Sequence, residues 1–415
     1  MKCRHVLEAD RERDEVATLP FDVYDADHHL YEPEEAFTRH LPKEFSNEFY
    51  FVKKGNRTKL VINGLLSEYI PNPTFEVVAA PGTHESWYRG TNTEGLSLRQ
   101  MSGEPLRPPP EWRSGDGRLK VMDQQGVHAA IVFPTLASVI EERLNDKPQA
   151  IAALFHSLNM WTNEEWGFAR ENRLFSVPMI NLADIDAAIA ELEFVLKAGA
   201  RTIGIRPAPV PDHRGRSRSF GFPEFDPFWA RVAEAGIFVN MHASDSGYDV
   251  INKMWSGGSG EFIAFEHDAH RQTLDVLGRP VADALSALIC HGVFARHPNL
   301  RVASVENGAS WVRPLLFRLN HAYGQLPKAF KEHPVDTFRR HVFVAPFYED
   351  DTEELKKDLP TNRIIFGSDY PHPEGLAEPL EYVKDFSTYS EAEVKQVFHS
   401  NVKGLLEGVR DEAYV

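Results

Sequence analysis

The chain is poor in cysteine, in net positive charge and in long apolar runs, and each shortage excludes a class of protein. Two cysteines in 415 residues, Cys3 and Cys290, cannot build a disulfide scaffold and fit a reducing compartment. The net charge of −16 argues against binding to nucleic acid or to an anionic membrane, because no positive field attracts phosphates. No apolar run approaches the roughly 18 residues of a membrane helix, and the charged start lacks the apolar stretch of a secretory signal. We therefore expect a cytoplasmic protein.

What the chain does contain is a rhythm of short apolar segments, rich in β-branched residues, that alternate with helical patterns. Segments of this kind are typical of strands that are buried on both faces. Eight strand–helix units predict an α/β protein with a distorted (β/α)8 or TIM barrel. The expected strands are Val23–Asp27, Ala129–Pro134, Leu174–Ile180, Thr202–Pro207, Ile237–His242, Arg301–Glu306, His341–Ala345 and Arg363–Gly367.

The chain is longer than the roughly 250 residues that such a barrel needs, so the excess must lie in insertions. The longest gap follows the first strand and predicts an insertion at about residues 40–115, with a hairpin of Phe49–Val52 and Lys59–Ile62. A second, longer loop is expected after the fifth strand. We interpret residues 1–18 as an N-terminal tail and residues 19–415 as one barrel domain.

Two helix starts are marked by capping residues. Asp184 precedes the helical pattern that begins at Ile185, and Ser390 with Glu393 has the spacing of a capping box.

Titratable side chains gather where the expected strands end. In a barrel of this kind the active-site groups come from the C-terminal ends of the strands and the loops beyond them. Asp27 and His29 are two residues apart, so on a strand they face the same side. Buried acids and imidazoles are costly unless they are paired, and a metal ion would offset that cost. The candidate site residues are Asp27, His29, Arg206, His242, Glu306, Asp369 and His372.

Four segments carry a resemblance to a known family: DADHHLYEP, NMHAS, GVFARHPNLRVASVENGASW and IIFGSDYPHPEG. They resemble the amidohydrolase-related family, in the branch typified by aminocarboxymuconate-semialdehyde decarboxylase. The resemblance implies a metal-dependent barrel enzyme with ligands from strands 1, 5 and 8, and a homodimer. Carried over by position, the implied ligands are Asp27, His29, His242 and Asp369.

The chain departs from that family pattern at two positions. Asp27 stands where the family often has a histidine and sometimes a glutamate. Glu306 stands where the decarboxylase branch usually has a histidine that is a proposed water activator. A carboxylate there adds a negatively charged ligand, favours a second metal and weakens the case for decarboxylation by the familiar route. We therefore expect one or two divalent ions, with Zn, Fe or Mn suited to nitrogen and oxygen ligands.

The function that we favour from the sequence is metal-dependent hydrolysis of an ester, thioester or amide. A metal lowers the pKa of bound water toward about 7, and Asp369, assisted by Glu306, would take the proton. The alternative is a non-oxidative decarboxylase or hydratase of an aromatic or unsaturated acid, with Arg206 holding the substrate carboxylate. A metal-stabilised binding protein that has lost catalysis is a third reading, which the intact His242 and Asp369 disfavour.

Two further features bear on the substrate. Arg214, Arg216 and Arg218 form a basic loop after the fourth strand that either is solvated or contacts a phosphate. Aromatic residues in the insertions either pack those insertions or line a pocket for a bulky apolar group. Together they favour a small-molecule substrate that is a bulky acyl thioester on a phosphorylated carrier. The expected substrate contacts are Arg206, Arg214, Arg216 and His372.

Overall fold

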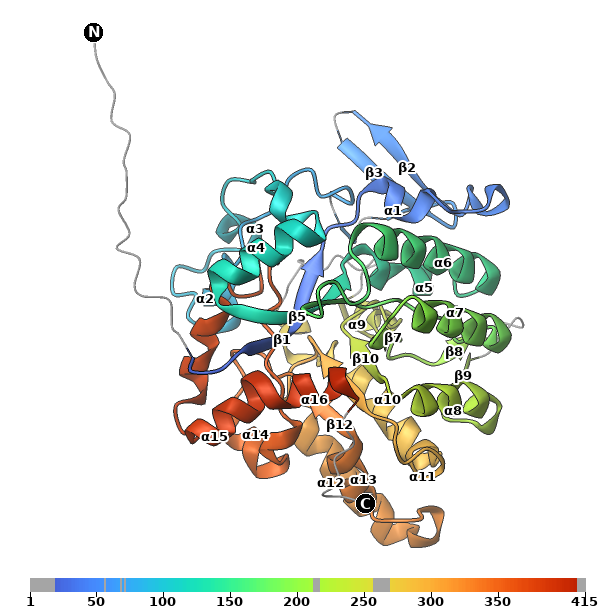
Figure 1. Ribbon diagram of the computed structural model, residues 1–415, viewed down its shortest axis with the longest axis vertical. Coiled ribbons are helices and arrows are strands. Elements are labelled where there is room, and N and C mark those ends of the chain that lie inside the picture. Colours follow the sequence, from blue (N-terminus) through green and yellow to red (C-terminus); the bar gives the residue numbers. More distant parts are fainter. Residues whose placement is uncertain are drawn as a thin grey trace.

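The computed structural model places a ring of parallel strands at the centre and helices around it (Figure 1). Seven strands form two parallel sheets, with the orders β1-β5-β6 and β12-β11-β10-β7. Their bounds are β1 Val23–Leu30, β5 Val127–Pro134, β6 Leu174–Ser176, β7 Thr202–Gly204, β10 Phe238–His242, β11 Val302–Val305 and β12 Val342–Val344. The structure describes residues 19–55, 57–67, 69–70, 72–211, 217–256 and 269–408.

Isolated backbone bridges join the edges of the two sheets. Met179 bridges Gly204, the last residue of β7, and Val344 bridges Ile364 in the segment expected to be the eighth strand. That segment reaches β1 through the hydrogen bond that Ala26 N–H donates to Phe366 C=O at 2.8 Å. The predicted barrel is thus confirmed, although its third strand is shorter than expected and the segment expected to be the eighth strand pairs only through isolated bridges and single backbone hydrogen bonds. β1 is longer than predicted and continues past Asp27 to Leu30.

Sixteen α-helices lie in the part of the chain that the structure describes. They are α1 Glu34–Thr38, α2 Glu85–Tyr88, α3 Leu98–Met101, α4 Gly115–Gln125, α5 Ile140–Arg143, α6 Pro148–Glu165, α7 Ile185–Lys197, α8 Asp226–Ala235, α9 Asp249–Ser256, α10 Gly278–Cys290, α11 Val293–Arg296, α12 Val312–Gln325, α13 Pro334–His341, α14 Thr352–Asp358, α15 Glu391–Lys395 and α16 Asn401–Glu407. Short 3-10 helices connect several of them, including Leu136–Val139 after β5 and Thr361–Arg363 before the eighth strand position.

The segment between β1 and β5 forms elements outside the barrel. It contains an antiparallel sheet of β2 Phe49–Lys54, β3 Arg57–Ile62 and β4 Leu65–Ser67. The hairpin predicted there is confirmed, and β4 extends it. This sheet lies at the periphery of the molecule, beside α1 and α6 (Figure 1).

Both capping predictions are confirmed. The Asp184 carboxylate accepts a hydrogen bond from Ala187 N–H at 3.1 Å at the start of α7. Ser390 and Glu393 form a reciprocal capping box at the start of α15.

Apolar packing fills the barrel and the layer between strands and helices. Inside the ring, β-strand side chains such as Ala129, Ile131 and Phe238 are buried in one cluster. A larger cluster joins the outer faces of the strands to the surrounding helices, and includes Trp229 and Leu285. Among the described residues, no helix is long and apolar enough to cross a membrane.

Candidate metal centre

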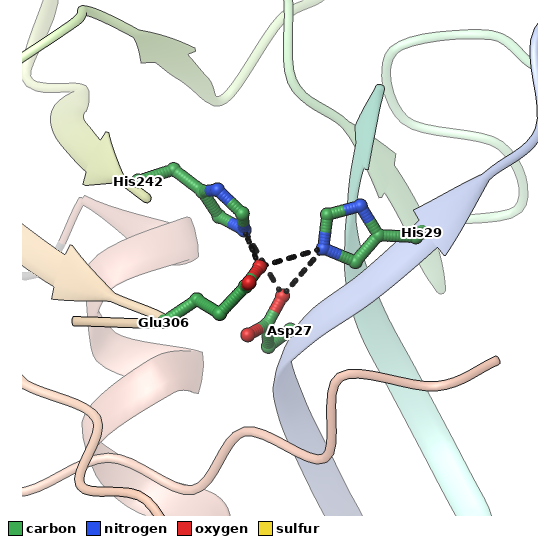
Figure 2. Close-up of side chains that lie close together, drawn as sticks. All are labelled: Asp27, His29, His242 and Glu306. Carbon is green, nitrogen blue, oxygen red and sulfur yellow. Dashed lines mark ion pairs between the residues drawn. The ribbon is translucent and has the colours of Figure 1, made fainter. Parts of the chain in front are cut away.

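Four titratable side chains from three strands of the barrel, or the residue that follows one, point toward one another (Figure 2). β1 supplies Asp27 and His29, which face the same side because they are two residues apart on a strand. His242 is the last residue of β10, and Glu306 directly follows β11. All four come from the C-terminal half or end of parallel strands, so the barrel brings them to one rim.

The donor atoms of these side chains are close together. His29 Nε2 lies 3.3 Å from Asp27 Oδ1 and 3.3 Å from Glu306 Oε2. His242 Nε2 lies 3.0 Å from Glu306 Oε2 and 3.5 Å from Asp27 Oδ1. One ligand atom from each of the four residues falls within 4.8 Å of all the others.

These separations fit the first coordination sphere of a divalent ion. Bonds of about 2.1 Å place two ligand atoms about 3.0 Å apart at a right angle and about 3.4 Å apart at the tetrahedral angle. In addition, Asp27 Oδ1, His29 Nε2 and His242 Nε2 are buried atoms that make no hydrogen bond within the described structure. Buried polar atoms in native proteins are normally satisfied, so atoms of this kind that face one another indicate a missing ion. The donor set therefore fits a divalent metal.

A second group of donors overlaps the first and adds Asp369 and His372. Asp369 Oδ1 lies 3.3 Å from His29 Nε2 and 2.8 Å from His372 Nδ1. The His372 ring stacks on His29, with ring centroids 3.9 Å apart. The structure thus brings together every residue that the sequence predicted as a ligand, together with His372.

Glu306 and Asp369 both have backbone angles in the left-handed region, with φ of 54° and 56°. Such conformations are unfavourable for residues with a side chain and persist where the surroundings enforce them, often at functional sites. Here they turn two carboxylates from the ends of the sixth and eighth strand positions into the same space.

The carboxylates change the protonation of the two imidazoles. Burial alone lowers the pKa of His242, but the negative carboxylates of Glu306 and Asp27 outweigh burial and raise it to about 10. The pKa of His29 is also raised, because the adjacent carboxylates of Asp27 and Glu306 outweigh burial. Both shifts have the same cause, so this space favours positive charge.

The pKa values of Asp369 and His372 are shifted so that the neutral form of each group is favoured. Burial, and then the negative charge of Glu306, raise the pKa of Asp369 well above its usual range. Burial, and then the positive charge of His29, hold the pKa of His372 well below its usual range. Burial thus favours the neutral form of both groups, which lie 2.8 Å apart.

One buried residue next to the metal centre, Asp25, connects the two backbone segments that carry Asp27 and Asp369. Asp25 Oδ1 accepts hydrogen bonds from Asp27 N–H at 2.9 Å and from Ser368 N–H at 3.0 Å. Because Ser368 precedes Asp369, a single carboxylate oxygen holds the backbone beside Asp27 and the backbone beside Asp369. His28 supports Asp25 at a distance of 3.2 Å to its other oxygen.

Of the predicted substrate contacts, Arg206 and His372 lie in the part of the chain that the structure describes. Arg206 is buried and donates from Nη1 to Glu142 Oε2 at 2.9 Å and to Asp245 C=O at 3.2 Å, so it is bound by a neighbouring acid. Arg214 and Arg216 lie outside the described residues. Arg218, at the end of the same basic loop, pairs with Glu224 at 3.1 Å and lies over the Phe225 ring, which is a packing role.

Two residues that support the site, Asp25 and Thr135, were not predicted from the sequence. Thr135 Oγ1 lies 3.0 Å from His372 Nε2 and 3.4 Å from His29 Nδ1, behind the donor set. A threonine directly after a strand carries no distinctive signal in a single sequence. Asp25 was visible in the DADHH segment, but its contact with Ser368 spans 343 residues and depends on closure of the barrel.

Comparison with known proteins places the chain in a family. The amidohydrolase family profile matches residues 24–406. A solved amidohydrolase from Mycobacterium avium subsp. paratuberculosis K-10 is 39% identical, has a TM-score of 0.88, and the match covers 94% of this chain and all of that one, at 100%. Comparison with curated proteins finds no match.

More distant structures share the fold. The 2,6-dihydroxybenzoate decarboxylase from Rhizobium is 19% identical with a TM-score of 0.56, over 80% of this chain and 97% of that one. The 5-carboxyvanillate decarboxylase from Novosphingobium aromaticivorans, solved with bound manganese, is 15% identical with a TM-score of 0.56, over 94% and 97%. With the family match and the donor set in agreement, the chain belongs to the amidohydrolase family and is an enzyme of that superfamily with a divalent metal as its cofactor.

Proposed function

We propose that the protein is a metal-dependent, non-oxidative decarboxylase of an aromatic or unsaturated carboxylic acid. The observation that carries this proposal is the pair of Asp369 and His372, whose Oδ1 and Nδ1 atoms lie 2.8 Å apart beside the donor set and can share one proton. Loss of carbon dioxide leaves an electron pair on carbon, and that carbon needs a proton from a nearby acid. The decarboxylases among the structures that share this fold add support, since they act on hydroxylated aromatic acids according to their names.

In this proposal Asp27, His29, His242 and Glu306 hold the metal, with Asp369 at its edge. Nitrogen and oxygen donors without a thiolate suit Zn, Fe or Mn, and the manganese of the solved decarboxylases favours Mn. When bound, the ion supplies positive charge that holds substrate oxygens and stabilises the electron density released in the reaction.

The proton transfer is assigned to Asp369. The bond between the substrate carbon and its carboxylate breaks, carbon dioxide leaves, and the electron pair stays on the carbon. Asp369 then gives its proton to that carbon and is left as a carboxylate at the edge of the donor set that would hold the metal. The burial that raises the pKa of Asp369 favours the protonated acid that this step requires.

One observation favours a second candidate, hydrolysis of an ester, thioester or amide. Glu306 places another negative charge 3.0 Å from His242 Nε2 and 3.3 Å from His29 Nε2. With Asp27 and Glu306 both ionised, a single divalent ion leaves no excess positive charge to attract an anionic substrate, whereas a neutral carbonyl compound meets no repulsion. The same Asp369 and His372 pair would then carry the proton for the leaving group.

The two candidates differ in the product. We would load the purified protein with Mn²⁺ and test a panel of ortho-hydroxylated aromatic acids for carbon dioxide release, beside a matched panel of their esters and thioesters for acid or thiol release. Asp369→Asn should abolish whichever activity is found, while Asp184→Ala serves as a control at a distant helix start. Carbon dioxide release supports the proposal. Release of acid or thiol from the esters, with no carbon dioxide from any acid, would overturn it in favour of hydrolysis.

A further inference from the structure

A hydroxyl group links the two stacked histidines of the site. Thr135 directly follows β5 and lies at the same rim of the barrel as the donor set. Its Oγ1 is 2.9 Å from the carbonyl oxygen of Leu30, 3.0 Å from His372 Nε2 and 3.4 Å from His29 Nδ1. One oxygen therefore contacts the last residue of β1 and both imidazoles.

The direction of each hydrogen bond follows from the groups involved. A hydroxyl has one hydrogen and two lone pairs, and a carbonyl oxygen can only accept. The hydrogen of Thr135 must therefore point to Leu30, and Oγ1 can only accept from the rings. His372 Nε2 and His29 Nδ1 must each carry a hydrogen.

These hydrogen bonds determine which imidazole nitrogens carry no hydrogen and have a free lone pair. In neutral His29 the hydrogen on Nδ1 leaves a lone pair on Nε2, the atom that faces Asp27 and Glu306 at 3.3 Å. A metal ligand needs that lone pair. In neutral His372 the hydrogen on Nε2 leaves Nδ1 bare, 2.8 Å from Asp369 Oδ1, so the hydrogen between these two atoms belongs to Asp369.

The buried side chain of Glu32 fixes the position of Thr135. The buried carboxylate of Glu32 accepts hydrogen bonds through Oε1 from Leu136 N–H at 2.8 Å and from Ala137 N–H at 3.3 Å. These amides begin the 3-10 helix Leu136–Val139, and free amides at such a start favour a negative charge. Glu32 thus holds the turn that presents Thr135.

We propose that Thr135, held by Glu32, is a positioning residue that fixes the tautomers of His29 and His372. It keeps the Nε2 lone pair of His29 available to the metal and the Nδ1 lone pair of His372 available to Asp369. The part that concerns His372 rests on the proposed function, whereas the part that concerns His29 depends only on metal binding.

The first test measures metal affinity. Thr135→Val keeps the branched shape and removes the hydroxyl, so His29 can also adopt the tautomer with hydrogen on Nε2, which cannot bind a metal. We expect the affinity for Mn²⁺, measured by competition with a chelator, to fall about 10- to 100-fold, as for other groups that orient a ligand. Thr135→Ser should restore it to within a few fold. Thr337→Val, which removes a buried hydroxyl bonded to Glu332 far from the site, should leave it unchanged.

The second test needs only the wild-type protein. In the zinc-loaded form, long-range ¹H–¹⁵N correlations should place the hydrogen of His29 on Nδ1 and that of His372 on Nε2. Unchanged Mn²⁺ affinity in folded Thr135→Val, or a hydrogen on Nδ1 rather than Nε2 of His372, would overturn the proposal. Neither readout depends on whether the enzyme releases carbon dioxide, so failure of the proposed function leaves the part of the inference that concerns His29 standing.

Discussion

At the scale of single residues, Glu306 most separates this site from a decarboxylase site with a histidine at that position. Its carboxylate contacts both His29 and His242, and the positive charge of these rings outweighs burial and holds the pKa of Glu306 well below its usual range. It is therefore ionised throughout the physiological range and contributes a full negative charge to the donor set.

Glu306→Gln removes that charge and keeps the size of the side chain. We expect it to lower the metal bound per chain at a fixed metal concentration and to reduce the rate by about 10²-fold or more, the scale of losing a main electrostatic contributor. Elemental analysis and turnover measurements check both effects. Glu193→Gln, which affects only an exposed ion pair with Arg231, is the matched control. Metal content and turnover rate equal to those of the wild-type protein in Glu306→Gln would show that Glu306 does not bind the metal.

A second residue-scale prediction concerns His341, far from the metal centre. Burial lowers its pKa to about 4, and its Nδ1–H donates to Leu300 C=O at 2.7 Å. The unfolded chain, with the ordinary pKa of 6.5, binds a proton between pH 6.5 and 4 that the folded protein does not. Stability is therefore lost as the pH falls through this window.

His341→Gln removes this titration. Between pH 7.5 and pH 5, we expect the wild-type free energy of unfolding to fall by about 2 kcal/mol more than that of the variant, at 1.36 kcal/mol per pKa unit. Urea unfolding at the two pH values measures the difference. Equal losses in both proteins would contradict a neutral, buried His341.

Some residues of the site could be predicted from the sequence by one general rule. Side chains at the ends of parallel strands meet at one rim, and this rule is enough for His242, Glu306 and Asp369. The rule does not predict the role of Thr135, which depends on the distance of its hydroxyl from two rings, nor the ion pair between Arg206 and Glu142. Such contacts join residues far apart in the chain and leave no periodic pattern.

At the scale of elements, the closure of the barrel and the geometry of the site depend on the same contact. Asp25 on β1 accepts hydrogen bonds from the backbone of β1 and from Ser368 in the eighth strand position. Removal of this carboxylate leaves two buried N–H groups unsatisfied, at about 1–3 kcal/mol for each group.

Asp25→Ala should therefore lower the melting temperature and weaken metal binding together, because Asp27 and Asp369 lose their common support. Asp184→Ala, which removes the N-cap of α7, should cost about 1 kcal/mol of stability and leave metal affinity unchanged. Calorimetry and metal competition separate the two effects. A destabilised Asp25→Ala with wild-type metal affinity would show that Asp25 supports the fold alone.

Elements with a strong local signal were predictable, and elements that depend on neighbours were not. The α7 start at Asp184 and the capping box of Ser390 follow from side chains next to the helix. In contrast, the third strand is shortened to Leu174–Ser176, and the seam with β7 is an isolated bridge at Met179, with hydrogen bonds from Gly204 N–H to Pro178 C=O and from Ile180 N–H to Gly204 C=O. The apolar run of residues 174–180 cannot show where pairing stops, because both neighbours decide it.

At the scale of the whole molecule, a chain with a net charge of −16 gathers three carboxylates at one buried rim. A metal that binds the folded state and not the unfolded chain stabilises the fold by mass action, by about 2.7 kcal/mol at 100 times the dissociation constant. Removal of the metal with a chelator should lower the melting temperature by several degrees, and added Mn²⁺ should restore it. His242→Ala should show no such dependence; a melting temperature independent of metal in the wild-type protein would contradict a metal centre.

The central claim is that Asp27, His29, His242 and Glu306 bind a divalent ion, and crystals grown with Mn²⁺ test it most directly. An anomalous difference map at a wavelength that excites manganese locates the ion without reference to activity. We predict one strong peak among Oδ1 of Asp27, Nε2 of His29, Nε2 of His242 and Oε2 of Glu306, at about 2.0–2.3 Å from these atoms. No peak at this rim in a protein that retains its Mn²⁺-dependent activity, or a peak elsewhere in the molecule alone, would contradict the claim.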